Sequence, residues 1–191
     1  MMTRLLVAIM LCGALAGAAA AGPLVNVTGV ADDDSLNLRA QPDANSARVG
    51  TIDAHDTKIE VIAVDTKGAD WVKVRKGKVE GWVNARFLAY EAGMPVKLKC
   101  VGTEPFWGID LGYQFAAADF RGMDGGQRKM SLAEPEVAAA RPSPWLVRFT
   151  DKGASFLLID RRTCSDGMSD TNYPYAVAAA VAGHFVEGCC R

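Results

Sequence analysis

Hydrophobic and polar residues alternate with a period of two along most of the chain after residue 34. In the first half, the alternating runs are separated by turns rich in Gly, Pro and Asp. Short strands that recur about every 10 residues between such turns are typical of a small β-barrel. The runs lie at 35–39, 49–52, 58–62, 71–75 and 81–84, followed by Phe87 and Leu88.

The alternation also predicts the core of this barrel, because successive side chains of a strand point to opposite faces. We expect Trp82 in the core, and Gly81 where the backbone passes close to a neighbouring strand. Asn37 and Arg39 should point away from the core. The predicted core positions are Leu36, Leu38, Val49, Ile59, Val61, Val72, Val74 and Val83.

The second half also consists of strand-like runs. Valines and the turn at Gly183 favour a strand over a helix at 176–182, and 132–144 should be a loop that packs little. We expect a second antiparallel β-barrel, with hairpin turns at 151–153 and 182–183. The predicted strands are 96–100, 107–111, 113–120, 145–149, 154–160, 175–181 and 184–190.

The start of the chain has the pattern of a cleavable secretory signal over residues 1–21. Arg4 precedes an apolar run, and Ala19 and Ala21 fit an A-x-A cleavage site. Leu11 stands before Cys12, where a lipoprotein signal needs a small residue, so Cys12 belongs to the discarded peptide rather than to a lipid anchor. No later segment is apolar enough to span a membrane.

Charge excludes a class of partners. The 21 Lys and Arg residues stand against 22 Asp and Glu residues, and losing Arg4 with the signal leaves a net charge of −2. Nothing in this balance favours nucleic acid or an anionic membrane surface.

Four cysteines remain after the signal, at Cys100, Cys164, Cys189 and Cys190. An even number in an oxidising compartment predicts two disulfides. Adjacent strand residues point to opposite faces, so Cys189 and Cys190 should reach separately to Cys100 and Cys164, with either pairing open. Without a C-x-x-C pair, zinc is not expected. All four lie after residue 99, which predicts two units: 25–90 and 96–191, joined by a linker at 91–95.

Four motifs in the first unit occur in the order and spacing of a known family. They are 36–42 (LNLRAQP), 49–52 (VGTI), 71–74 (WVKV) and 81–88 (GWVNARFL). Residues 25–90 thus resemble the bacterial SH3 domain. The resemblance implies a barrel that holds extended peptides in an aromatic-lined groove. Candidate ligand contacts are Asn37, Arg39 and the partly exposed Trp71, and the expected partner is cell-wall peptide or an envelope protein.

The second unit resembles an uncharacterised group of exported bacterial proteins and lipoproteins. The resemblance lies in 102–107 (GTEPFW), 164–175 (CSDGMSDTNYPY) and the terminal Gly188-Cys189-Cys190. It implies no activity. Both resembling families are common in the periplasm, so we expect a periplasmic or secreted protein.

The candidate functional residues of the second unit are acidic and aromatic. Glu104 with Asp166 or Asp170 could pair across a glycosidase-like cleft. Otherwise Glu104 caps a turn and both aspartates bond loop amides. Trp107 and Tyr173 are either a ligand shelf or core residues.

The motifs of other hydrolases are missing from the sequence. It has no G-x-S-x-G or H-E-x-x-H segment, and its two histidines, His55 and His184, are far apart. The acidic segment at 166–170 lacks the pattern of a calcium loop. We therefore expect an exported binding protein without catalytic residues, metal or cofactor. The alternative is a cell-wall hydrolase, or a hydrolase inhibitor, using Glu104 and Asp166.

Overall fold

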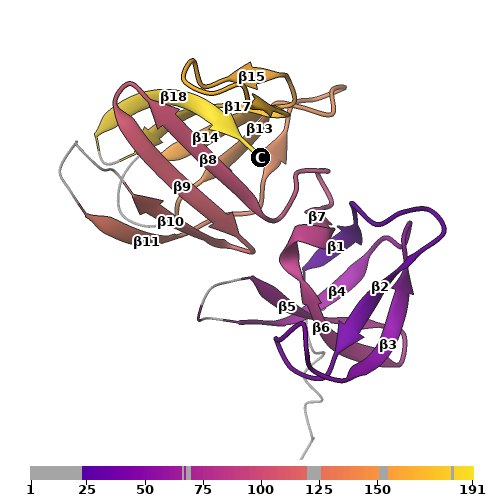
Figure 1. Ribbon diagram of the computed structural model, residues 1–191. Coiled ribbons are helices and arrows are strands. Elements are labelled where there is room, and N and C mark those ends of the chain that lie inside the picture. The colour runs from indigo at the N-terminus through magenta and orange to yellow at the C-terminus, as the bar shows by residue number, and fades with distance from the viewer. Residues whose placement is uncertain (1–22, 66, 68–69, 120–125, 151–154, 182) are drawn as a thin grey trace, which may run out of the picture.

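The computed structural model describes residues 23–65, 67, 70–119, 126–150, 155–181 and 183–191, and these residues form two all-β units (Figure 1). The predicted signal at 1–21 lies outside the described residues. No helix in the described part of the chain has the length and hydrophobicity needed to cross a membrane.

The N-terminal unit is one seven-stranded sheet in the order β3-β2-β6-β5-β4-β1-β7. All five predicted runs are strands, and Phe87 and Leu88 lie where η1 meets β7. The sequence pattern missed β1, which is held by long-range pairing with β4 and β7. The elements are β1 (Leu24–Val27), β2 (Ser35–Arg39), β3 (Arg48–Asp53), β4 (Ile59–Val64), β5 (Trp71–Lys76), β6 (Val79–Asn84), the 3-10 turn η1 (Ala85–Phe87) and β7 (Leu88–Tyr90).

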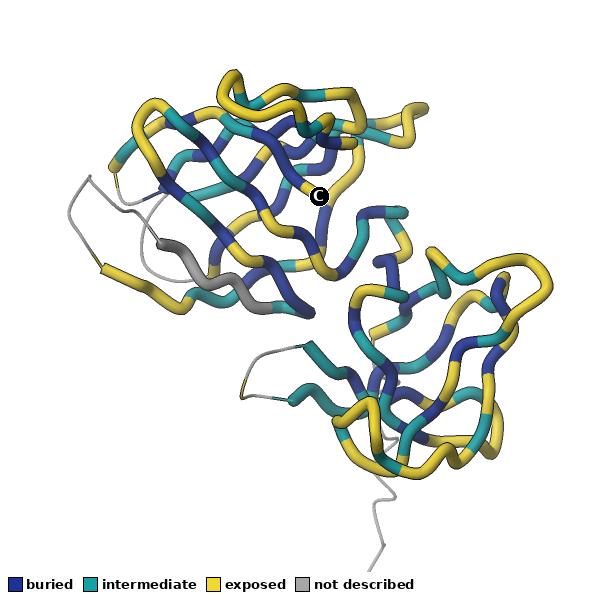
Figure 2. The backbone as a smooth tube through the Cα atoms, in the orientation of Figure 1, coloured by how far each residue is buried: buried dark blue, intermediate teal, exposed yellow. Residues whose placement is uncertain are grey.

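Seven of the eight predicted core residues are buried, and Val49 is not. Val49 is 51% exposed because Gly50 and Ile52 are the positions of β3 that face inward, opposite Leu38 and Leu36. Trp82 is also wrong as a core residue: it is only partly buried, since its neighbours Gly81 and Val83 face inward. Figure 2 shows this alternation of buried and exposed positions.

Gly81 lies where the sequence placed it, at a close approach of two strands. A Cβ at this position would lie 2.8 Å from Cβ of Leu38 and 3.1 Å from the carbonyl oxygen of Arg39. Glycine is therefore required by packing of β6 against β2.

The C-terminal unit is a nine-stranded antiparallel sheet, in the order β11-β10-β9-β8-β18-β17-β14-β13-β12, with a separate β15–β16 pair. It curls into a half-barrel, and a bridge joins Leu132, which follows the last residue of β11, to Phe149, which follows the last residue of β13. The strands are β8 (Leu98–Thr103), β9 (Phe106–Gly112), β10 (Phe115–Asp119), β11 (Gln127–Ser131), β12 (Glu136–Val137), β13 (Trp145–Arg148), β14 (Phe156–Asp160), β15 (Cys164–Ser165), β16 (Asn172–Tyr173), β17 (Tyr175–Val181) and β18 (His184–Cys190).

All seven predicted strands of this unit are present, and the segment at 176–181 is strand rather than helix. The turn predicted at 151–153, with residues 154 and 182, lies outside the described residues. The expected loose loop at 132–144 is wrong in part. Leu132 and Pro135 are buried, and β12 pairs with β13 as the edge strand of the sheet. Leu132 also bridges to Phe149, so the segment packs against the end of the sheet.

Two disulfides are present, Cys100–Cys190 and Cys164–Cys189. This confirms that the adjacent cysteines bond separately, and it fixes the pairing that the sequence left open. Cys190 lies directly opposite Cys100 in the β8–β18 pair. Cys189 faces the other side of β18 and holds β15, so the two bonds act on opposite faces of one strand.

The two units contact each other through the chain around residues 90–97. The rings of Tyr90 and Tyr113 stack with centroids 5.6 Å apart, and the Tyr90 hydroxyl accepts a hydrogen bond of 3.0 Å from the Gln114 backbone N–H. The Trp145 indole N–H donates to the Ala92 carbonyl at 2.8 Å. Met94 in this segment is 1% exposed. The segment is therefore packed against both units.

Candidate functional site: two binding cavities

A cavity of about 330 Å³ opens on the N-terminal unit and is called the N-terminal cavity below. The structure brings all three predicted contacts, Asn37, Arg39 and Trp71, to its lining. They come from β2 and β5, which are not adjacent strands, because β6 lies between them. The sequence motifs therefore meet in space. The residues that line it are Gly29, Val30, Ala31, Asp34, Ser35, Leu36, Asn37, Arg39, Ala44, Trp71, Asn84, Arg86 and Phe87.

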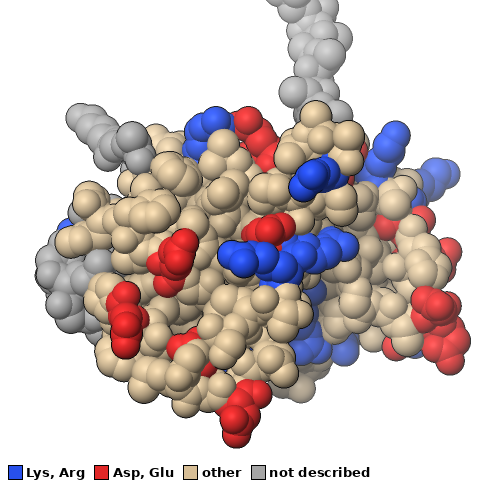
Figure 3. Space-filling view, turned by 90° about the horizontal axis from the view of Figure 1, so that it is seen from above, with Lys and Arg blue, Asp and Glu red and all other residues tan. Residues whose placement is uncertain are grey.

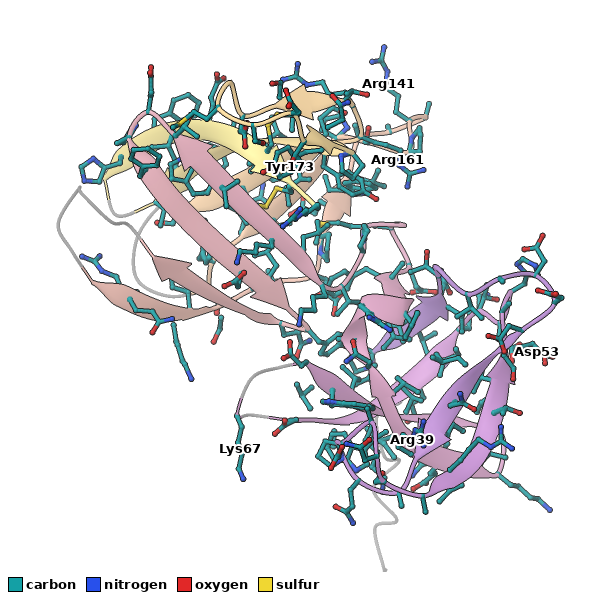
Figure 4. The ribbon with its side chains drawn as sticks, viewed as in Figure 1. Arg39, Asp53, Lys67, Arg141, Arg161 and Tyr173 are labelled. Carbon is teal, nitrogen blue, oxygen red and sulfur yellow. A yellow bond between two sulfur atoms is a disulfide. The ribbon has the colours of Figure 1, made fainter. Side chains whose placement is uncertain are left out.

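Arg39 is partly buried and has a fixed position. Its Nη1 donates to the Ser46 carbonyl at 2.8 Å, which ties β2 to the turn that follows it. Asn37 is exposed, and its Oδ1 accepts a hydrogen bond of 3.4 Å from Arg48. Figure 4 shows Arg39 on the lower part of this unit, away from Asp53. A held guanidinium and a partly exposed indole in the lining of one cavity suit a ligand with both a carboxylate and an apolar part.

The sequence reasoning did not single out Asn84, Arg86 and Phe87 as contacts. Arg86 and Phe87 belong to η1. Asn84, the last residue of β6, caps this turn, because its side chain accepts a hydrogen bond of 3.1 Å from the Arg86 N–H. The Arg86 guanidinium lies 4.4 Å from the centre of the Phe87 ring. The sequence could have indicated these three residues, because they lie inside the last motif of the family resemblance, at 81–88. With Arg39, Arg86 and Asp34 in the lining, the formal charge of the cavity is positive.

A larger cavity, of about 540 Å³, lies on the C-terminal unit and is called the C-terminal cavity below. It is lined by Glu104 and Asp166, so the structure brings these two predicted residues together. Asp170 is not in the lining. Among the described residues, no group of three or more His, Cys, Asp and Glu is placed to hold a metal ion.

The Asp166 carboxylate is saturated by its own loop. Oδ1 accepts from the backbone N–H groups of Met168 at 3.0 Å and Ser169 at 2.8 Å. Oδ2 accepts from the Ser169 hydroxyl at 2.9 Å and the Tyr173 hydroxyl at 3.0 Å. The bonds from the Ser169 and Met168 amides lower the pKa of Asp166 to about 2. A carboxyl that stays ionised cannot act as a general acid near neutral pH.

These bonds predict a pH effect on stability. The folded pKa of Asp166 lies below its unfolded value, so its contribution is present above about pH 4 and is lost as the pH falls towards 2. Between these values, the free energy of unfolding of the Asp166→Asn variant should depend less on pH than that of the wild type. Urea denaturation from pH 2 to 6 tests this, and equal slopes in both proteins would contradict it.

Trp107 and Tyr173 are packed side chains. Trp107 is 4% exposed and its indole N–H donates to the Glu187 carbonyl at 3.1 Å, while Tyr173 is 8% exposed. These placements favour the core interpretation over a ligand shelf.

The motifs of the second unit meet around the Trp107 ring. A Cβ at Gly102 would lie 1.9 Å from the Trp107 indole nitrogen, and one at Gly188 would lie 2.8 Å from its Cζ2. The Thr103 hydroxyl donates to the Asp166 carbonyl at 3.0 Å, which joins 102–107 to 164–175. The three motif segments therefore pack together as one structural unit. Two glycines make room for the Trp107 indole, and the Asp166 carboxylate holds the loop at 166–169 through hydrogen bonds.

Comparison with known proteins agrees with the N-terminal geometry. Residues 34–89 match the family model of the bacterial SH3 domain, inside the predicted limits of 25–90. A bacterial SH3 domain is a binding module, typically for the cell wall. Comparison with curated proteins and with solved structures gave no match.

Proposed function

We propose that this protein is an exported, non-enzymatic binding protein of the cell envelope. Its SH3 domain takes an extended peptide with a free carboxylate, from the cell wall or from a protein partner, in the N-terminal cavity. The observation that carries the proposal is the convergence of Asn37, Arg39 and Trp71 on this cavity. Two disulfides fit export to an oxidising compartment.

The lining of the N-terminal cavity supports an anionic ligand. Arg39 uses one N–H on Ser46 and keeps further donors, and Arg86 is exposed. Guanidinium groups bind carboxylates through paired N–H donors. The Trp71 ring, partly exposed, offers an apolar surface for the neighbouring side chain of the peptide.

The hydrolase alternative rests on Glu104 and Asp166 lining one cavity. Against it, the oxygens of Asp166 already accept four hydrogen bonds, which leaves them occupied by a structural role. This occupation of Asp166 supports the proposal that the pair is not catalytic. Release of soluble fragments from peptidoglycan by the wild type, but not by Glu104→Ala, would overturn the non-enzymatic proposal.

Sedimentation with insoluble peptidoglycan tests the binding site. We expect the wild type to sediment, and Arg86→Gln to bind about fivefold more weakly, the size of about 1 kcal/mol for an exposed charge pair. The matched control is Lys78→Gln, which removes the same charge from an exposed turn outside the cavity. Equal binding of both variants would contradict the site. If the wild type does not sediment, the cell-wall ligand is excluded and the proposed ligand is the peptide of a protein partner.

A further inference from the structure

The floor of the C-terminal cavity is the outer face of the sheet. Leu158 and Ala178 point into the cavity, since their strand neighbours Ile159 and Ala179 are buried in the core. The register places Leu158, Ala178 and Glu187 in one row across β14, β17 and β18. The row continues to β8, which adds Val101 and Thr103 to the lining. Most side chains of the floor are thus small or apolar, and Glu187 places a carboxylate in the row.

The size of this floor suits an extended chain. It crosses four neighbouring strands, so it is about 14 Å long at the ~4.8 Å spacing of a sheet. An extended peptide rises about 3.3 Å per residue, which corresponds to about four residues. The segment 162–166 lies along the cavity and Glu104 and Pro144 complete its lining.

Large apolar side chains remain uncovered beside the floor. Leu158 is 39% exposed, and Phe185, two residues before Glu187 on the same face of β18, is 68% exposed. Phe185 lies opposite Ala180, which in turn lies opposite Phe156. Phe156, Ala180 and Phe185 thus form a second row, next to the row of Leu158, Ala178 and Glu187. This second row extends the apolar surface along the strands. A ligand on the floor would cover part of it.

The charge of the lining identifies the ligand class. Four carboxylates, from Glu104, Asp160, Asp166 and Glu187, face one guanidinium, from Arg162. Asp160 is compensated by Arg162 at 3.6 Å and by the Ser143 hydroxyl at 2.7 Å. Within the described part of the chain, the side-chain carboxylates of Glu104 and Glu187 have neither a hydrogen-bond nor an ion-pair partner. Figure 3 looks down on this unit and shows acidic side chains spread over its left part, apart from the basic ones near the centre.

We propose that the C-terminal cavity binds an extended basic peptide of about four residues. Lys or Arg side chains of the peptide reach Glu104 and Glu187, and their apolar stems lie on Leu158 and Phe185, because long cationic side chains cover apolar surface while keeping their charge in water. The aromatic face of Phe185 adds a favourable contact for the cation. This site is separate from the N-terminal cavity, whose lining is positive.

Fluorescence anisotropy with a labelled, amidated Lys-Ala-Lys-Ala peptide tests the proposal on the full chain. We expect binding that weakens with salt, and no binding of a Glu-Ala-Glu-Ala peptide. The double variant Glu104→Gln/Glu187→Gln should bind about tenfold more weakly, from two exposed charge pairs. Both side chains are exposed and unpartnered, so this variant keeps the fold. Ala178→Phe should abolish binding, because the ring fills the floor.

Two matched controls separate this site from the rest of the molecule. Asp53→Asn removes one carboxylate from an exposed position of β3 in the other unit, and should change affinity less than twofold. Arg86→Gln, which weakens the N-terminal cavity, should leave basic-peptide affinity unchanged. The proposal is overturned if the wild type fails to bind the basic peptide, binds both peptides equally, or loses no affinity in the double variant.

Discussion

Replacing Gly188 by alanine should destabilise the C-terminal unit by about 3 kcal/mol or more, the upper range for added atoms in a packed core. The new Cβ would lie 2.1 Å from the carbonyl oxygen of Val101 and 2.8 Å from Cζ2 of Trp107. The first contact is with backbone, so β18 would have to move away from β8. Urea denaturation followed by circular dichroism measures the loss.

A matched control is available at Gly126. No atom lies within 4 Å of a Cβ built there, so Gly126→Ala should change the free energy of unfolding by less than about 0.5 kcal/mol. If Gly188→Ala were as stable as Gly126→Ala, the glycine–indole packing described above would be wrong.

Removing the disulfide between Cys100 and Cys190 should cost more stability than removing the one between Cys164 and Cys189. The first closes a loop with a sequence separation of 90 and the second one of 25. Loop-closure entropy then gives about 4.6 and about 3.5 kcal/mol at 25 °C. Paired Cys→Ala variants, compared by urea denaturation, test the order.

The two pairs control for each other, since each variant removes two thiols from the same unit. Reductant should lower the wild type to below either variant and should still destabilise both variants, which each retain one bond. The reverse order of stability would mean that the entropy of the unfolded chain does not dominate.

Period-two alternation predicted most of the strands, because each of these has one face in a core, but it missed β1, β11, β12, β15 and β16. The alternation did not predict burial correctly where the strand register determines which side chains face the core. Val49 was predicted as a core residue and Ile52 was not, but β3 turns the face with Gly50 and Ile52 towards the core. The strand β1 depends on pairing with β4 and β7, which are distant in the chain, and a local pattern carries no signal for such pairing. The strand β12 has two residues, too few to show an alternation.

The candidate sites show the same division. The resemblance to an SH3 domain pointed to three residues that line the N-terminal cavity, because the motifs that carry it lie on β2 and β5, which both border this cavity. The roles of Asp166 and Trp107 were open, since a carboxylate or an indole in a motif serves packing or binding equally well. Packing and binding roles are distinguished only by the structure, in which the Asp166 oxygens are occupied by hydrogen bonds and Trp107 is buried.

The stacked Tyr90 and Tyr113 rings and the Trp145–Ala92 bond join the two units on either side of a short segment. A joint of this kind sets the spacing and direction of the two cavities. A partner that carries an acidic end and a basic stretch at the matching distance would engage both, and the second contact would then form at a high effective concentration. The protein would select such a partner by the distance between its charges as well as by their sign.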